Sequence, residues 1–265
     1  MTKYLCVTCG TQYPPSDGPP AGCPICEDDR QYINRAGQMW TTLEERQGQH
    51  RNVFEPVAEG LWTVSTTPKL GIGQRAHLLR TGGGNILWDC LAYLDDAAVA
   101  QINSLGGLSA IAISHPHFHT TMLDWSHAFG DIPVYVHRDN APWVVQPGDA
   151  VRYWDDAALE IAPGVTLVHC GGHFPGSSVL YWADGEGALF TGDTIYIVAD
   201  PRWVTFMYSY PNLIPLDAAS VRGIASAVRP YEFERLYDPF SLPIEHAAAA
   251  IVQRSAERYV QRIGG

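Results

Sequence analysis

Four of the six cysteines lie within the first 26 residues, as two C-x-x-C pairs: Cys6 with Cys9, and Cys23 with Cys26. Two such knuckles can place four thiolates around one ion in a tetrahedral arrangement. The stretch between them is rich in Pro and Gly and is a poor helix former. A segment with so few apolar residues needs a metal to fold. The spacing therefore predicts a closed, structural zinc ribbon at residues 1–35, with iron as an alternative ion.

The paired knuckles resemble those of rubredoxin, with a shortened loop between them. Two disulfides are the alternative reading of the same cysteines, and they are typical of secreted proteins. The first ten residues, MTKYLCVTCG, lack the basic start and apolar run of a signal peptide. We therefore expect a cytoplasmic protein with a metal-bound ribbon.

The remaining composition is that of a folded enzyme-like chain. Of the 265 residues, 46% are apolar and 17% are charged, which argues against general disorder. No run reaches the roughly 18 apolar residues of a membrane helix. The net charge of −11 repels nucleic acid and anionic lipid. We expect a small-molecule substrate, no membrane and no nucleic acid, and we leave the oligomeric state open.

The rest of the chain divides into a connector and a large domain. Residues 36–58 are largely polar, and the capping-box spacing from Thr42 to Glu45 predicts a short helix there. Over residues 59–265, short apolar runs alternate with amphipathic stretches bounded by Asp, Gly or Pro. This pattern predicts two mixed sheets with helices outside, closed by a long helix over residues 243–263.

Candidate metal ligands follow three apolar runs. His115 and His117 follow the run SAIAIS, and residues two apart in an extended segment point the same way. His173 follows a Gly-Gly pair, and Asp193 ends the run ALFTGD. Histidine nitrogens together with one carboxylate are a common ligand set for catalytic zinc or iron. These residues therefore predict an open metal site at the strand ends.

Residues 59–265 resemble the metallo-β-lactamase superfamily, with glyoxalase II-like hydrolases as the nearest motif relatives. The resemblance rests on the segments NILWD, SHPHFH, GGHFPGS and TGD, in that order. It implies an α+β fold, the αββα sandwich, with the metal at the edge between the two sheets. It also implies His115, His117 and His173 as ligands of the first metal, and Asp193 as the carboxylate that bridges two metals where both bind. Asp89 would orient a ligand by hydrogen bonding.

The sequence departs from the family pattern at the second metal site. The usual motif is His-x-His-x-Asp-His, but here His119 stands at the Asp position and Thr120 at the last His position. The family's final ligand, often in a Gly-His step, is also missing, and the nearby His246 falls in the expected closing helix. Three possibilities stay open: one ion on the first site, a second site rebuilt around His119, or a relic site. We expect one ion rather than two.

These residues predict a metal-dependent hydrolase. Zinc lowers the pKa of its bound water to about 7, and the resulting hydroxide would attack an ester, thioester, lactone or amide. His119 would replace the missing Asp as a catalytic proton shuttle. Two alternatives are a mononuclear non-haem iron oxygenase, as in persulfide dioxygenases of the superfamily, and a catalytically degenerate binding module.

Overall fold

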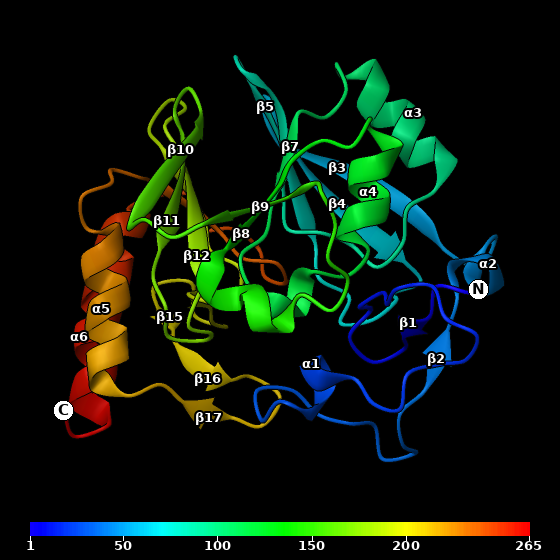
Figure 1. The fold of residues 1–265 in the computed structure, drawn as a ribbon. Helices are drawn as coiled ribbons and strands as arrows, with labels where there is room; N and C mark the ends of the chain where they lie inside the picture. The colour runs from blue at the N-terminus through cyan, green and yellow to red at the C-terminus, as the bar shows by residue number, and fades with distance from the viewer.

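Two β-sheets lie face to face in the computed structural model, which describes residues 1–265 (Figure 1). The seven-stranded sheet has the order β3-β4-β5-β6-β7-β8-β9, and the five-stranded sheet has the order β10-β11-β12-β13-β18. The strands of the first sheet are β3 Arg51–Ala58, β4 Leu61–Thr67, β5 Ala76–Thr81, β6 Gly84–Trp88, β7 Ala110–Ala112, β8 Val134–His137 and β9 Val151–Trp154. Those of the second are β10 Ala158–Ala162, β11 Val165–His169, β12 Ser178–Trp182, β13 Ala188–Phe190 and β18 Arg235–Tyr237.

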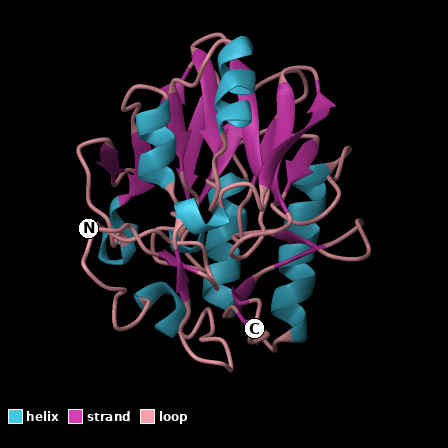
Figure 2. Ribbon diagram, turned by 90° about the vertical axis from the view of Figure 1, so that its right-hand side faces the viewer, coloured by secondary structure: helices cyan, strands magenta, loops and turns pink.

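Two helices cover the outer face of each sheet (Figures 1 and 2). Helices α3 (Asp96–Ser104) and α4 (Met122–Ala128) pack on the seven-stranded sheet, and α5 (Ala218–Val228) and α6 (Ala248–Arg262) pack on the five-stranded sheet. Asp95 caps α3, as its acidic start predicts, because its carboxylate accepts the N–H of Ala98. The αββα sandwich expected from the sequence is therefore confirmed.

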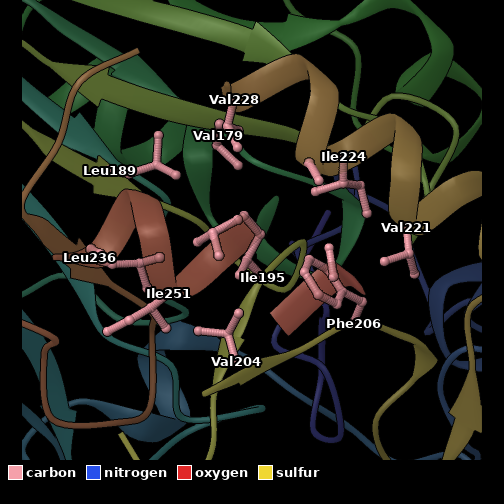
Figure 3. Close-up of a cluster of buried hydrophobic side chains, with 14 of the residues drawn as sticks. Val179, Leu189, Ile195, Val204, Phe206, Val221, Ile224, Val228, Leu236 and Ile251 are labelled. Carbon is pink, nitrogen blue, oxygen red and sulfur yellow. The ribbon is translucent and has the colours of Figure 1, made fainter. Parts of the chain in front are cut away.

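Alternation along the strands explains why the layers form. In β11, β12 and β13, every second side chain faces the other sheet and the side chains between them face α5 and α6. Leu167, Leu180 and Phe190 belong to the core between the sheets. Figure 3 shows the outer cluster, in which Val179 and Leu189 pack against Ile224 of α5 and Ile251 of α6. Each apolar face thus finds a partner layer.

Short elements complete the fold. The N-terminal segment contains β1 Leu5–Cys6, α1 Pro24–Glu27, β2 Trp40–Thr41 and α2 Leu43–Arg46. The 3₁₀ helices are η1 Pro116–Phe118 and η2 Arg138–Trp143. Two small hairpins lie between β13 and α5, formed by β14 Tyr196–Ile197, β15 Val204–Thr205, β16 Met207–Ser209 and β17 Ile214–Pro215. The capping box predicted at Thr42 and Glu45 is confirmed at the start of α2.

Two elements of the large domain differ from the sequence expectation. Strand β3 lies within the predicted connector, where it pairs with β4 as an edge strand. An edge strand is half exposed, tolerates a proline such as Pro56 and has a weak apolar signal. The closing helix begins at Ala248 rather than near residue 243, because Ile244 forms a β-bridge with Leu236 and Ala247 adopts a φ of +56°. His246 therefore precedes the helix.

Strand β1, in the predicted ribbon, pairs with β2 at Trp40–Thr41, in the predicted connector. The division of the chain at residues 35 and 58 stays a prediction. No helix has the length and apolar character needed to cross a membrane.

Candidate metal centre

Loops that follow three strands bring the predicted ligands together. His115 and His117 follow β7, His173 follows β11, and Asp193 follows β13. One donor atom of each lies within 4.8 Å of the others. We call these four residues the histidine centre.

The route by which His115 and His117 converge differs from the predicted one. His115 is extended, with φ −165° and ψ 170°, but Pro116 starts the 3₁₀ helix η1 and carries His117 around a turn. Alternation in an extended strand therefore does not explain the pair. The turn presents Nε2 of His115 and Nδ1 of His117 toward the same carboxylate oxygen of Asp193.

The donor separations fit a single small ion. For ligand bonds of about 2.05 Å, a regular tetrahedron places its donor atoms about 3.3 Å apart. Oδ2 of Asp193 lies 3.4 Å from Nε2 of His115, 3.9 Å from Nδ1 of His117 and 3.8 Å from Nε2 of His173. Nε2 of His173 lies 3.5 Å from Nδ1 of His117. In addition, Nε2 of His115 and Oδ1 of Asp193 are buried without a hydrogen-bond partner, which is costly unless another group binds them.

Burial sets the charge of the centre. The three histidines are at most 2% exposed, and Asp193 is 6% exposed. Burial lowers the pKa of His115 to about 4 and that of His173 well below the usual range, so both rings are neutral at pH 7. Burial raises the pKa of Asp193, but the neighbouring histidines outweigh this effect and hold it well below its usual range. Neutral imidazoles beside a carboxylate are the protonation states that bind a cation.

Hydrogen bonds fix the rings from behind. Nδ1 of His173 lies 3.1 Å from the carbonyl oxygen of Met207, which requires a proton on Nδ1 and leaves the Nε2 lone pair free. The Ser114 hydroxyl lies 2.8 Å from Nδ1 of His115, and the Ser114 N–H donates to Oδ1 of Asp89 at 2.8 Å. Asp89 is thus linked to His115 through the hydrogen bonds of Ser114.

Asp89 and Gly192 occupy a crowded corner beside this serine. Asp89 has a φ of +62°, and burial raises its pKa to about 7 against the opposing effect of the Ser114 hydrogen bond. Gly192 has a φ of +51°, and a Cβ atom there would lie 2.5 Å from Oγ of Ser114. Only glycine leaves room for the serine at this point.

His119 and His246 are not members of the histidine centre. His119 is buried, its Nδ1 lies 3.3 Å from the carbonyl oxygen of Trp143, and its Nε2 has no partner. Burial lowers the pKa of His119 to about 3. His246 is exposed. The carboxylate of Asp238, which precedes His246 in the chain, accepts hydrogen bonds from the backbone N–H groups of Ile197 and Phe240.

The four predicted cysteines form a second centre, which we call the cysteine site. All four are buried and none forms a disulfide. The Sγ atoms of Cys6 and Cys26 are 3.6 Å apart, as are those of Cys9 and Cys23. Zinc–sulfur bonds of about 2.3 Å would place tetrahedral sulfurs about 3.8 Å apart. The site is therefore compatible with a zinc ion, and the disulfide alternative does not hold.

Sequence reasoning missed several residues that contact the histidine centre. The Phe174 ring lies 5.0 Å from that of His117 and 5.2 Å from that of His173. The Tyr210 hydroxyl donates to the carbonyl oxygen of Asp193 at 3.0 Å. Arg30, from the N-terminal segment, donates through Nε to the carbonyl oxygen of His173 at 2.5 Å.

A third group of possible ligands, His137, Asp139 and His169, has a geometry that does not suit a metal. The two imidazoles stack with their centroids 3.9 Å apart and their planes 11° apart. Stacked rings direct their in-plane lone pairs side by side rather than toward one point. Nε2 of His169 also lies 2.8 Å from the carbonyl oxygen of Pro175.

Comparisons with known proteins agree with this architecture. The family model for the metallo-beta-lactamase superfamily matches residues 72–237. The uncharacterized protein YmaE of Bacillus subtilis (strain 168) is 47% identical over 268 residues, which cover 99% of this chain and 97% of that protein. Among solved structures, VMB-1 aligns with a TM-score of 0.61 at 9% identity, covering 81% of this chain and 99% of its own. FIM-1 from Pseudomonas aeruginosa, solved in a mono-zinc form, aligns with a TM-score of 0.55 at 17% identity, covering 79% and 96%.

Proposed function

Because the chain belongs to the metallo-β-lactamase superfamily, we propose that it is a metal-dependent hydrolase with one active-site ion held by the histidine centre. The convergence of four donor atoms from three separate loops, 3.4–3.9 Å apart where they face one another, carries this proposal. A zinc or iron ion bound there would supply a Lewis acid and an acidified water. Ester, thioester, lactone and amide carbonyls are the substrate groups that this chemistry suits.

The residues beside the centre support separate roles for proton movement and orientation. His119 holds its Nδ1 proton toward Trp143, so its Nε2 lone pair can accept a proton during the reaction. Burial lowers the pKa of His119 to about 3, so the ring is neutral at pH 7 and its Nε2 carries no proton before the reaction. Ser114, fixed by Asp89, would hold the ring of His115 in orientation.

Aromatic side chains favour an apolar acyl group on the substrate. Asp193 is the most exposed member of the centre, and the Tyr210 hydroxyl binds its backbone. The rings of Tyr210 and Tyr196 lie 4.8 Å apart, and the Tyr196 ring lies 6.2 Å from that of Phe240, which is 39% exposed. This row of rings extends from the centre to the surface and could bind apolar substituents.

Metal analysis combined with a substrate panel tests the proposal. We expect two ions in each chain, one at each centre, and hydrolysis of at least one acyl substrate that a chelator abolishes. Iron at the histidine centre together with oxygen uptake would instead support the iron oxygenase. A histidine centre that binds neither zinc nor iron would support the binding module.

His119→Ala separates the two possible roles of that residue. If His119 moves a proton, the variant keeps its metal content and loses turnover. An equal loss of metal and activity would make His119 a ligand.

A further inference from the structure

Arg30 connects the ribbon to the loop that carries the third histidine ligand. Its Nε donates to the backbone carbonyl of His173 across a separation of 143 residues. We propose that the ribbon holds the histidine centre in its metal-binding geometry, and that Arg30 is the positioning residue through which it does so. The proposal rests on the proposed function, because it assumes that the histidine centre binds an ion.

The Arg30 side chain is held in one orientation. It is 13% exposed, and its Nη1 binds both carboxylate oxygens of Asp28, at 2.8 and 2.9 Å. The guanidinium carbon lies 4.5 Å from the centre of the Phe174 ring and 4.3 Å from that of Tyr208. A planar cation between two rings and a carboxylate has little freedom, so its hydrogen bond to His173 has a fixed direction.

The cysteine site fixes the segment from which Arg30 projects. Helix α1 is the second knuckle, and it begins directly after Cys23 and includes Cys26. The N–H of Asp28 donates to the carbonyl of Pro24 at the end of that helix. Because a segment this short depends on its metal to fold, loss of the ion would release both Asp28 and Arg30.

The β16–β17 hairpin lies beside this segment, as Figure 1 shows. The Tyr208 hydroxyl donates to Oδ1 of Asp29 at 2.6 Å, and Oγ of Ser209 donates to the carbonyl of Arg30 at 3.0 Å. The amide of Asn212 donates to the carbonyl oxygens of Asp29 and Gln31, at 2.9 Å each. The contact between ribbon and large domain is thus a specific hydrogen-bonded interface.

The loop that carries His173 is not held by regular secondary structure and contains two flexible glycines. Gly171 and Gly172 precede His173 with φ values of +65° and +81°, and no regular element includes the loop. Glycines give the unfolded loop many conformations, so external contacts must select the one that places the imidazole. Arg30 supplies a charged hydrogen bond to the backbone of the ligand itself.

A second set of contacts, made by Trp143, also links the cysteine site to the histidine centre. The Trp143 side chain packs against the buried cluster that contains the four cysteines, and its ring lies 5.0 Å from that of Phe174. Its carbonyl oxygen is the acceptor for His119. Occupancy of the cysteine site and affinity at the histidine centre are therefore coupled, and by linkage each ion strengthens the binding of the other.

Cobalt-substituted full-length protein tests the positioning role of Arg30, because thiolate-to-cobalt absorption reports on the cysteine site separately from the d–d bands of the histidine centre. The variants are Arg30→Ala and Arg30→Lys. The control is Arg138→Ala, which removes an arginine that also has a carboxylate partner, Asp155, and a tyrosine neighbour, Tyr153, but is exposed and does not contact the centre.

We expect Arg30→Ala to weaken binding at the histidine centre about 10–100-fold, as loss of supporting contacts around metal ligands usually does. The thiolate bands stay unchanged, Arg30→Lys falls between, and Arg138→Ala matches wild type. Unchanged affinity in Arg30→Ala with both bands intact overturns the proposal.

Hydrogen exchange of residues 171–177 gives a readout that does not require an ion at the histidine centre. We expect faster exchange in Arg30→Ala than in wild type and in Arg138→Ala, and equal exchange overturns the positioning role. If the wild-type centre binds no ion, the proposed function fails, while this measurement still decides whether Arg30 orders the loop.

Discussion

The hydroxyl oxygen of Ser114 lies 2.8 Å from Nδ1 of His115, on the side of the ring opposite to the nitrogen that faces Asp193. The serine hydroxyl can accept a hydrogen bond from a protonated Nδ1 of His115. When Nδ1 carries the proton toward Ser114, Nε2 keeps its lone pair for a cation. Asp89 reinforces the arrangement by accepting the Ser114 N–H.

Replacing Ser114 by Ala removes the hydroxyl and leaves the backbone contact with Asp89 in place. We expect about a 10–100-fold loss of affinity at the histidine centre, with the cysteine site unaffected. Titration with a competing chelator measures it. Ser126→Ala is the matched control, because its buried hydroxyl binds the carbonyl of Ile132 away from the centre. Equal affinity in the two variants would remove Ser114 from the list of orienting groups.

Gly192→Ala tests the close contact between Gly192 and Ser114 by adding a Cβ atom. Its Cβ would lie 2.5 Å from Oγ and 2.6 Å from Cβ of Ser114, so the serine must move and with it the ring of His115. We expect loss of about 1–3 kcal/mol of stability, together with weakened metal binding. Gly185→Ala is the control, because its φ of +57° imposes similar backbone strain with no atom within 4 Å. Both variants share the backbone strain, so a larger loss of stability in Gly192→Ala than in Gly185→Ala reports the clash. Thermal unfolding with and without added metal measures this difference and the metal-dependent part of the stability.

The sequence predicts the layers of the fold and the grouping of the candidate ligands because both depend on local patterns. The alternation in β11 to β13 and the periodicity of α5 are visible without a structure, and so are short motifs at strand ends such as TGD. The convergence of His115 and His117 was predicted correctly for the wrong local reason. A proline-initiated 3₁₀ turn, rather than strand alternation, aims the two rings.

What the sequence could not predict depends on contacts between distant residues. The Arg30 hydrogen bond to His173 spans 143 residues, and nothing near Arg30 in the chain marks it as different from a surface arginine. Strand β3 was not predicted for a similar reason. Its partner β4 provides the pairing, and its own residues are half exposed. Tertiary context decides both.

His117→Ala should remove one of the two expected ions and leave the other bound at the cysteine site. The substitution deletes a donor that lies 3.5 Å from Nε2 of His173 and leaves the cysteines, which have their own packing cluster, intact. Elemental analysis should give one ion per chain, and hydrolytic activity should fall by at least 100-fold. A variant that keeps both ions would mean that the remaining donors suffice.

His77 should make the fold sensitive to acid. It is 2% exposed, its ring lies 5.1 Å from that of Phe190, and its Nδ1 has no partner. Burial, aided by the nearby charge of Arg75, lowers its pKa from the ordinary 6.5 to about 3. Between these two values the unfolded chain binds a proton that the folded chain does not. The free energy of unfolding therefore falls as the pH falls from 6.5 toward 3, by at most about 1.4 kcal/mol per pH unit for this group.

In His77→Phe this contribution disappears, so its unfolding free energy should decline less steeply than that of wild type between pH 6 and 4. Urea denaturation at several pH values measures both slopes, and loss of metal in acid affects the two proteins alike. His127→Phe is the control, because the His127 side chain is 82% exposed and its variant should follow the wild-type curve. Parallel curves for wild type and His77→Phe would mean that the buried ring is protonated in the folded state, most simply because a water molecule reaches Nδ1.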